Sequence, residues 1–313
     1  MWNNAYAEGS ALMTTRRIGE TTVTRVYEQM GPGFPAQHLL PDWDPAVLDE
    51  HSGWLSPNYY EAATGKFISS IHSWVIKTKH HTILVDTCCG NGKDRPGSDR
   101  FHMLDTPYLD RLRAAGVLPE QVDYVMCTHL HVDHVGWNTK LLDGRWVPTF
   151  PNAKYVFSRV EADYWDPAKN KDLAPAQAAI FTDSVLPVIA AGQAQVVEMT
   201  DQIGDGQIGD ALLIEPAPGH APGHVVLRLI SGGDEAIFIG DVMHHPIQVY
   251  RPEWSSRFCA DPKLAEASRR RVLDLCCETG ARVFPAHFGV PHVGRVRRAG
   301  AGYRFEFDHA ENA

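Results

Sequence analysis

Three histidines and an aspartate crowd into the six-residue stretch 129–134, whose sequence is HLHVDH. Imidazole and carboxylate are side chains that bind zinc and the neighbouring divalent transition metals. In extended backbone, alternate residues face the same side, so His129 and His131 can bind one ion together. Asp133 and His134 can then turn toward a second ion. This density of ligand-type residues predicts a metal site, whereas a lone pair of histidines would be weak evidence.

The predicted site begins where a strand ends. The apolar run 122–127 precedes it and predicts a buried strand. Three other apolar runs are also followed by a His or Asp: 211–214 by His220, 236–239 by Asp241, and 281–284 by His287. Layered α/β folds usually bind ligands along the edge where their strands end. We therefore expect these residues to converge at one edge of the sheet structure.

Together with Val85-Asp86-Thr87, these motifs resemble those of metallo-β-lactamase-fold hydrolases. The similarity is greatest to the dinuclear enzymes, which include lactonases and methyl parathion hydrolase-like enzymes. The matched motifs span most of the chain. The resemblance implies an α/β fold, a four-layer αββα sandwich with the metals at one edge of two packed sheets.

The resemblance also implies a role for each motif residue. The expected ligands are His129, His131 and His220 for the first ion, Asp133, His134 and His287 for the second, and Asp241 as a bridge between them. Two divalent ions are therefore expected, with zinc preferred and manganese, cobalt or iron as alternatives.

Two further residues are expected behind the ligands. The resemblance implies that Asp86 orients the ligand loop from outside the coordination sphere, as such carboxylates commonly do. The alternative is an aspartate that caps the turn after its strand. His224 competes with His220 for the ligand role, but the family pattern puts the metal on the first histidine. His224 is therefore expected to be structural.

The expected chemistry is hydrolysis by a hydroxide that bridges two metal ions, with Asp133 orienting the water or shuttling its proton. Acyl-homoserine lactonases carry a Tyr three residues after the bridging Asp that helps to polarise the carbonyl, whereas this chain has His244. His244 is expected either to donate to the oxyanion or to line the pocket. The departure means that a substrate cannot be inherited from that branch.

The favoured reaction is the opening of a lactone or the cleavage of a carboxylic ester, with phosphotriester hydrolysis as the alternative. An iron-dependent oxygenase or redox member of the fold is a second alternative. However, the corresponding motif of flavodiiron proteins resembles His-x-Glu-x-Asp, whereas this chain has His at position 131. A binding protein without catalysis would be expected to have lost ligands, and all seven are present.

Composition narrows the partners. The formal net charge of the 313 residues is -9, which argues against a nucleic-acid partner and against the nucleases of this fold. The basic run 295–298 is more simply the solvated face of a strand.

Six residues close to the motifs predict a pocket for a small molecule with an apolar portion: Trp137, His245, Tyr250, Trp254, Phe258 and Phe288. Ordinary core packing is the alternative for each of them.

Ligands from Asp86 to His287 must converge, which predicts a single domain over residues 15–313 after a flexible extension over residues 1–14.

The six cysteines lack metal-binding or disulfide spacing, which favours reduced thiols and a cytoplasmic location. No apolar run is long enough to span a bilayer, so no membrane partner is expected. The segment 31–58 is expected to form a lid or a homodimer contact, and 90–105 a solvated loop.

Local signals predict strands over 21–27, 73–78 and 82–86, the last two joined by a hairpin around 79–81. Two helices are predicted from a cap residue, a following Pro and a closing Gly: one from 106–107 to 116, and one from 261–262 to 280. The stretch 157–191 is predicted to be mainly helical.

Overall fold

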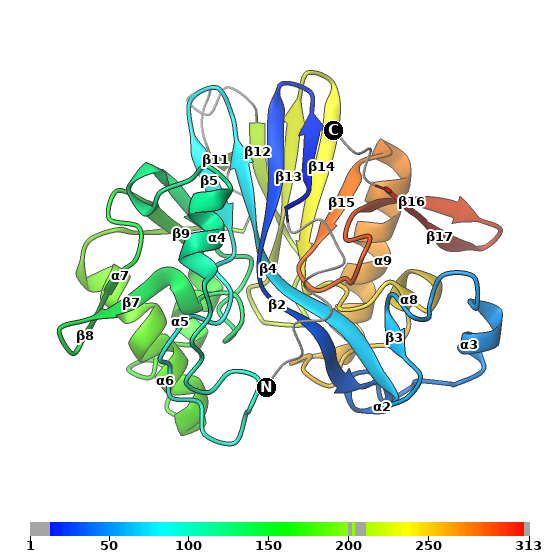
Figure 1. The fold of residues 1–313 in the computed structure, drawn as a ribbon, viewed down its shortest axis with the longest axis horizontal. Coiled ribbons are helices and arrows are strands. Elements are labelled where there is room, and N and C mark those ends of the chain that lie inside the picture. The colour runs from blue at the N-terminus through cyan, green and yellow to red at the C-terminus, as the bar shows by residue number, and fades with distance from the viewer. Residues whose placement is uncertain (1–12, 200–201, 204–210, 310–313) are drawn as a thin grey trace.

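The computed structural model describes residues 13–199, 202–203 and 211–309. Within these ranges the strands form two large sheets that face each other, together with one separate hairpin (Figure 1). The first sheet has the hydrogen-bonded order β1 (Thr15–Ile18), β2 (Thr21–Pro35), β4 (Lys66–Lys77), β5 (Thr82–Val85), β6 (Tyr124–Met126), β9 (Lys154–Ser158) and β10 (Ala194–Val197), with β3 (Tyr60–Glu61) paired to β4.

The second sheet has the order β11 (Gln202–Ile203), β12 (Ala211–Pro216), β13 (Val225–Ser231), β14 (Asp234–Gly240), β15 (Arg282–Pro285), β16 (Gly294–Ala299) and β17 (Gly302–Phe307). The hairpin is β7 (Thr139–Leu142) with β8 (Arg145–Pro148). The helices are α2 (Ala36–Leu39), α3 (Val47–Glu50), α4 (Tyr108–Ala114), α5 (Arg159–Tyr164), α6 (Pro175–Ser184), α7 (Leu186–Ala190), α8 (Ile247–Tyr250) and α9 (Pro262–Thr279), with 3-10 turns η1 (Pro119–Gln121) and η2 (Gly136–Asn138).

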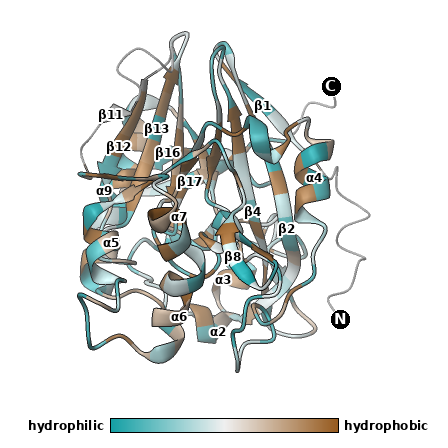
Figure 2. Ribbon diagram, turned by 90° about the vertical axis from the view of Figure 1, so that its left-hand side faces the viewer, coloured by the Kyte–Doolittle hydropathy of each residue, from teal (hydrophilic) through white to brown (hydrophobic). Residues whose placement is uncertain are grey.

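Helices cover the outer faces of the two sheets, with α4 on one side and α9 on the other (Figure 2). The apolar positions of the strands lie between the sheets and between each sheet and its helices. In the central layer, Trp74 of the first sheet meets Phe284 of the second edge to face, with ring centroids 4.9 Å apart. This arrangement confirms the expected α/β fold and its αββα layering.

Parallel pairing decides where the loops lie. Strands β5, β6, β9 and β10 run parallel to one another, and β14 runs parallel to β15. Strand β12 has the same direction as β14, because both are antiparallel to β13. The C-terminal ends of β5 and β6, and those of β12, β14 and β15, therefore open into one shared edge of the sandwich, which is where the expected ligands occur in the sequence.

Several predicted elements differ in their bounds. Strand β2 continues to Pro35 and β4 begins at Lys66, since the two pair along their whole length, so the segment 31–58 begins inside the sheet. Helix α4 begins at Tyr108 with no side-chain cap, and the Thr106 hydroxyl faces Glu28 Oε1 and Asn91 Oδ1, each at 3.2 Å, in place of the helix. The helical stretch 157–191 is broken between α5 and α6. The hairpin between β4 and β5 is confirmed.

The described part of the chain holds no helix that is both long and apolar enough to cross a membrane. Residues 1–12 of the expected N-terminal extension lie outside the described ranges. Thr14, its last residue, accepts a backbone hydrogen bond from Arg25 of β2 over 3.0 Å. The tie to the sheet therefore begins one residue before the expected domain boundary.

Helix α9 has the termini that the sequence predicts. The Asp261 carboxylate accepts from the backbone N–H groups of Lys263 and Leu264, at 3.1 and 3.0 Å, and Gly280 follows the last turn. We expect Asp261→Ala to lower the free energy of unfolding by about 1 kcal/mol, because two helix N–H groups lose their acceptor. Urea denaturation measures the change. Asp261→Ser, which restores a capping oxygen, should recover most of it, and equal losses in both variants would contradict the capping role.

Candidate metal centre

The expected ligands meet at the shared edge of the two sheets. The first sheet supplies the loop after β6, which carries His129, His131, Asp133 and His134. The second sheet supplies three loops that follow strands of the same direction: His220 after β12, Asp241 after β14 and His287 after β15. Residues far apart in the sequence therefore form a cluster, because the strands that precede them end at the same edge.

The cluster divides into two groups. In the first, one ligand atom from each of His129, His131, His220 and Asp241 lies within 4.8 Å of the others, and in the second the same holds for Asp133, His134 and His287. Within the first group, His220 Nε2 lies 2.9 Å from His131 Nδ1.

Asp241 faces both groups with different oxygen atoms. Its Oδ2 lies 3.1 Å from His220 Nε2 and 3.8 Å from His129 Nε2. Its Oδ1 lies 2.9 Å from His287 Nε2 and 3.3 Å from His134 Nε2. One carboxylate that is only 4 % exposed thus separates two sets of imidazole nitrogens.

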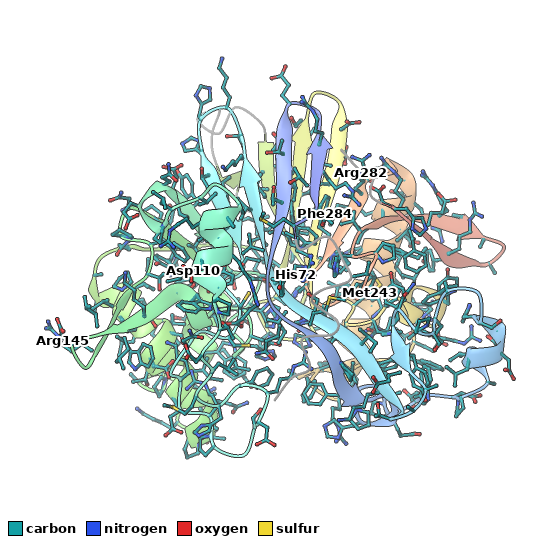
Figure 3. The ribbon with its side chains drawn as sticks, in the orientation of Figure 1. His72, Asp110, Arg145, Met243, Arg282 and Phe284 are labelled. Atoms are coloured by element: carbon teal, nitrogen blue, oxygen red, sulfur yellow. The ribbon has the colours of Figure 1, made fainter. Side chains whose placement is uncertain are left out.

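The nitrogens that point away from the cluster are held by hydrogen bonds. His134 Nδ1 lies 2.8 Å from Asp86 Oδ2, and His287 Nδ1 lies 3.0 Å from the Ser70 carbonyl. A metal-binding histidine usually donates its second N–H in this way, which fixes the ring and its tautomer. His72, labelled near the centre of Figure 3, holds the Pro285 carbonyl just before His287 over 3.0 Å.

Asp86 ties the end of β5 to the ligand loop. Its Oδ1 accepts from the Thr128 N–H at 2.8 Å, and its Oδ2 contacts His134. The residue adopts a φ of 57°, in the left-handed region that non-glycine residues rarely enter. Asp86 therefore contacts both the main chain and a histidine side chain of this loop, as an outer carboxylate that orients ligands would.

His224 supports the Asp241 loop without joining either group. Its Nε2 accepts from the Asp241 N–H at 2.9 Å. The two loops can meet because residue 240 is glycine: a Cβ there would lie 2.6 Å from His224 Nε2 and 2.8 Å from Thr128 Oγ1. Gly240 also has a φ of 48°. Burial lowers the pKa of His224 well below its usual value, which keeps the accepting nitrogen free of a proton.

The histidines fall into two electrostatic classes. Burial, together with the neighbouring His220, lowers the pKa of His131 to about 3, so its imidazole is neutral at pH 7. Burial acts to lower the pKa of His220, His134 and His287 as well. Asp241 and other nearby acceptors outweigh this effect, so the pKa of each of the three lies above its ordinary value, and the pKa of His220 is raised to about 9. The negative charge of the carboxylates therefore favours a positive charge on these rings or between them.

The chemistry of the cluster fits divalent metal ions. Within the described residues, His129 Nε2, His134 Nε2 and Asp241 Oδ1 are buried without a hydrogen-bond partner. Buried polar atoms without a partner are rare in native proteins and call for a missing ion or water. A cation beside Asp241 would satisfy all three atoms. Imidazole and carboxylate together suit zinc and the other transition metals in the first row.

A cavity of about 440 Å³ opens onto both groups, and Asp133, Asp241 and His244 are among its lining residues. His244 Nε2 lies 3.2 Å from Asp241 Oδ2, and burial lowers the pKa of His244 to about 4. The larger apolar walls are Phe34, Leu39, Phe101, Trp165, Ile180 and Phe258. The cavity can therefore hold a small molecule with an apolar portion against the two groups.

Five of the six expected pocket residues do not line this cavity. Trp137 stacks on Tyr108 behind the ligand loop, and His245 stacks on Phe67 with ring centroids 4.0 Å apart. The other three pack into the core beneath the second sheet: Tyr250, Trp254 and Phe288. The chain after Asp241 turns inward as α8, a direction that proximity in the sequence cannot predict. Among the expected pocket residues, Phe258 does line the cavity.

The cavity walls come from segments that the sequence assigned to other roles. Phe34 and Leu39 belong to the segment expected to be a lid or dimer contact, and they lie beside Phe258. Arg100 and Phe101 come from the expected solvated loop 90–105. Arg100 Nη2 donates to Ser69 Oγ at 2.8 Å. Two arginines, Arg100 and Arg257, also line the cavity, although the sequence has no basic cluster near a ligand motif.

Residues 68–297 match the family described as the metallo-beta-lactamase superfamily, and the chain belongs to that superfamily. Among its curated relatives is an N-acyl homoserine lactonase AttM of Azorhizobium caulinodans, 28% identical over 187 residues, which are 58% of this chain and 64% of the relative. The AttM lactonase of Agrobacterium fabrum is 32% identical over 123 residues, 38% of this chain and 40% of the relative. The matches thus span less than two thirds of these relatives.

Solved structures agree with the assignment. The crystal structure of the hydrolase AbOPH, in the beta lactamase superfamily, has a TM-score of 0.78 and 26% identity, and the likeness covers 97% of this chain and 100% of AbOPH. AidC, described as a dizinc quorum-quenching lactonase in complex with a product, has a TM-score of 0.73 and 21% identity over 97% of this chain and 100% of its own. At 21% identity, the similarity to AidC shows a shared fold only.

Asp86→Ala tests the outer contacts of the second group. We expect the affinity for a zinc ion to fall by about 10- to 100-fold, because His134 loses the carboxylate that orients its ring. Competition with a chromogenic chelator measures the affinity. Asp110→Ala is the control, since Asp110, labelled in Figure 3, is exposed on α4 and pairs with Arg113 at 2.6 Å. Unchanged zinc affinity in Asp86→Ala would leave Asp86 as a turn residue only.

Proposed function

We propose that this protein is a dinuclear zinc hydrolase that opens a lactone or cleaves a carboxylic ester. In this proposal the first ion is held by His129, His131 and His220, the second by Asp133, His134 and His287, and Asp241 bridges them. Zinc is the proposed metal, and analysis of the purified protein distinguishes it from manganese, cobalt or iron. Iron would favour the oxygenase alternative.

The observation that carries the proposal is the position of the two Asp241 oxygens. Oδ2 faces the first group and Oδ1 faces the second, and each lies about one hydrogen-bond length from the nearest imidazole nitrogen, at 3.1 and 2.9 Å. A carboxylate placed in this way could contact an ion in each group, which supports the proposed bridge. It lies at the cavity, so a substrate held there would reach both groups.

Two bound divalent ions would lower the pKa of water toward neutrality and polarise the oxygen of the scissile bond. Asp133 lies on the cavity side of the second group, with its oxygens 3.7 Å from His134 Nε2 and His287 Nε2. It can therefore hold a proton at a carboxylate oxygen that faces the substrate. His244 is proposed to donate to the oxygen on which negative charge develops.

The proposed substrate is small, with an apolar portion and a carbonyl group. Apolar walls such as Phe34, Ile180 and Phe258 favour burial of an acyl or aryl group, at roughly 25 cal/mol per Å². The names of the AttM relatives support lactone opening as the first choice. All six cysteines are free thiols within the described ranges, which supports the proposed cytoplasmic location. The homodimer stays a prediction.

A turnover screen tests the function directly. Zinc-loaded protein is assayed on acyl-homoserine and other medium-chain lactones, aryl esters, phosphotriesters and RNA. We expect lactones or aryl esters to react fastest, with little dependence on salt, because the cavity walls are mainly apolar. Asp241→Ala is the control and should lose metal and turnover together. Fastest turnover of phosphotriesters or RNA, or full activity of Asp241→Ala with two metal equivalents, would contradict the proposal.

His244→Ala separates two roles of that residue. If His244 donates to the substrate oxygen, kcat should fall by about 10²- to 10³-fold while zinc affinity and KM change little. Steady-state kinetics on the best substrate and zinc titration measure these effects. A loss confined to zinc affinity would mean that His244 only holds Asp241, its partner at 3.2 Å. Unchanged kinetics would mean that His244 only lines the pocket.

A further inference from the structure

A buried carboxylate outside the ligand set joins the two loops that carry the histidines of the first group. Glu161 lies in the first turn of α5 and is 0 % exposed. An acidic residue at this end of a helix is common, because it complements the partial positive charge of the helix N-terminus. Complete burial is not common, since removing a carboxylate from water is costly unless its oxygens accept several hydrogen bonds.

Glu161 has three donors, and each comes from a different part of the site. Its Oε2 accepts from the Leu130 N–H at 2.9 Å and from the Trp165 indole N–H at 2.7 Å. Its Oε1 accepts from the Gly223 N–H at 2.7 Å. Leu130 stands between His129 and His131, in the loop from the first sheet. Gly223 follows His220 in the loop from the second sheet. The Glu161 side chain therefore links a loop from each sheet.

The close approach of the Gly223 loop to α5 is independent evidence for this link. A Cβ at residue 223 would lie 2.5 Å from Ser158 Oγ and 2.7 Å from the Glu161 nitrogen. Ser158 Oγ also donates to the Gly223 carbonyl at 2.8 Å. The loop that carries His220 is therefore held on both its N–H and its carbonyl side, at a distance that only glycine permits.

The third donor belongs to the cavity wall. Trp165 lines the cavity, and its ring meets that of His131 at a steep angle, with centroids 5.2 Å apart. His131 in turn lies 2.9 Å from His220 Nε2. The contacts of Glu161 thus lead to a ligand loop from each sheet and to the wall beside them, while none of its three donors belongs to the second group.

We propose that Glu161 is a positioning residue that sets the spacing of the first metal group by holding the Leu130 and Gly223 backbones together. The proposal rests on the proposed function to the extent that the group binds metal. All three partners donate, so both oxygens of residue 161 must accept. Glutamine has the same shape but presents one donor in place of an acceptor, so Glu161→Gln breaks the link on one side with little change in volume.

The experiment measures zinc affinity for each group separately, without substrate. Asp133→Ala weakens the second group and His220→Ala weakens the first, so each background reports mainly on the other group. Glu161→Gln is then added to both. Competition with a chelator should show an affinity about 10- to 100-fold lower in the Asp133→Ala background, a magnitude typical of outer-sphere partners. The His220→Ala background should change by less than about threefold.

Glu28→Gln is the matched control. Glu28 is also a buried carboxylate whose oxygens accept from main-chain N–H groups and an indole, those of Cys89, Gly90 and Trp137. Glu28→Gln should leave the zinc affinity of the first group unchanged. If Glu161→Gln fails to fold, Gly223→Ala displaces the same loop and should weaken the first group selectively.

Equal losses in both backgrounds, or equal effects of Glu161→Gln and Glu28→Gln, would overturn the proposal in favour of a general packing role. Wild-type protein that binds no zinc would overturn the proposed function and the positioning role together. Wild-type protein that binds two equivalents but hydrolyses none of the substrates would overturn the proposed reaction alone, because the zinc measurement does not depend on turnover.

Discussion

The structure depends on one electrostatic constraint, the burial of Asp241 among imidazoles at the edge of two sheets. A carboxylate that is 4 % exposed cannot retain its charge in an apolar interior without compensating positive charge or donors. The histidines of both groups provide that compensation only where the loops after β6, β12, β14 and β15 meet. The sandwich supplies this meeting point because strands in both sheets end at the same edge.

Outer hydrogen bonds convert this meeting point into a defined site. Asp86, Ser70 and His224 contact a ligand ring or the main chain of a ligand loop, so the loops are fixed at more than their ligand atoms. The hydrophobic layers hold the sheets at a constant separation, because interiors pack as densely as organic crystals. Apolar packing therefore sets the distance between the sheets, and polar contacts set the orientation of the ligands.

The cavity shows how function can depend on segments remote from the motifs. Its walls come from the end of β2, from the loop 90–105 and from α6, and these surround the two groups of candidate ligands with mainly apolar surface. The chain is acidic overall, with a net charge of -9, yet Arg100 and Arg257 lie at the cavity. Net charge thus describes the long-range field of the molecule and not the local chemistry that a substrate meets.

The sequence by itself determined the candidate ligands and the caps of α9, because these depend on local spacing: alternate residues in extended backbone, ligand residues at strand ends, and a cap followed by Pro. The layered fold followed from the resemblance of these motifs to those of metallo-β-lactamase-fold hydrolases. The sequence could also indicate that Asp86 and His224 lie near the ligands. Only the tertiary structure decided which side chains line the cavity, since Tyr250, Trp254 and Phe288 turn into the core while Phe34 and Trp165 turn toward the site. The same holds for Glu161, whose position in a first helical turn is ordinary and whose three donors are brought together by contacts between the sheets. Directions of this kind depend on long-range packing, which no local pattern encodes.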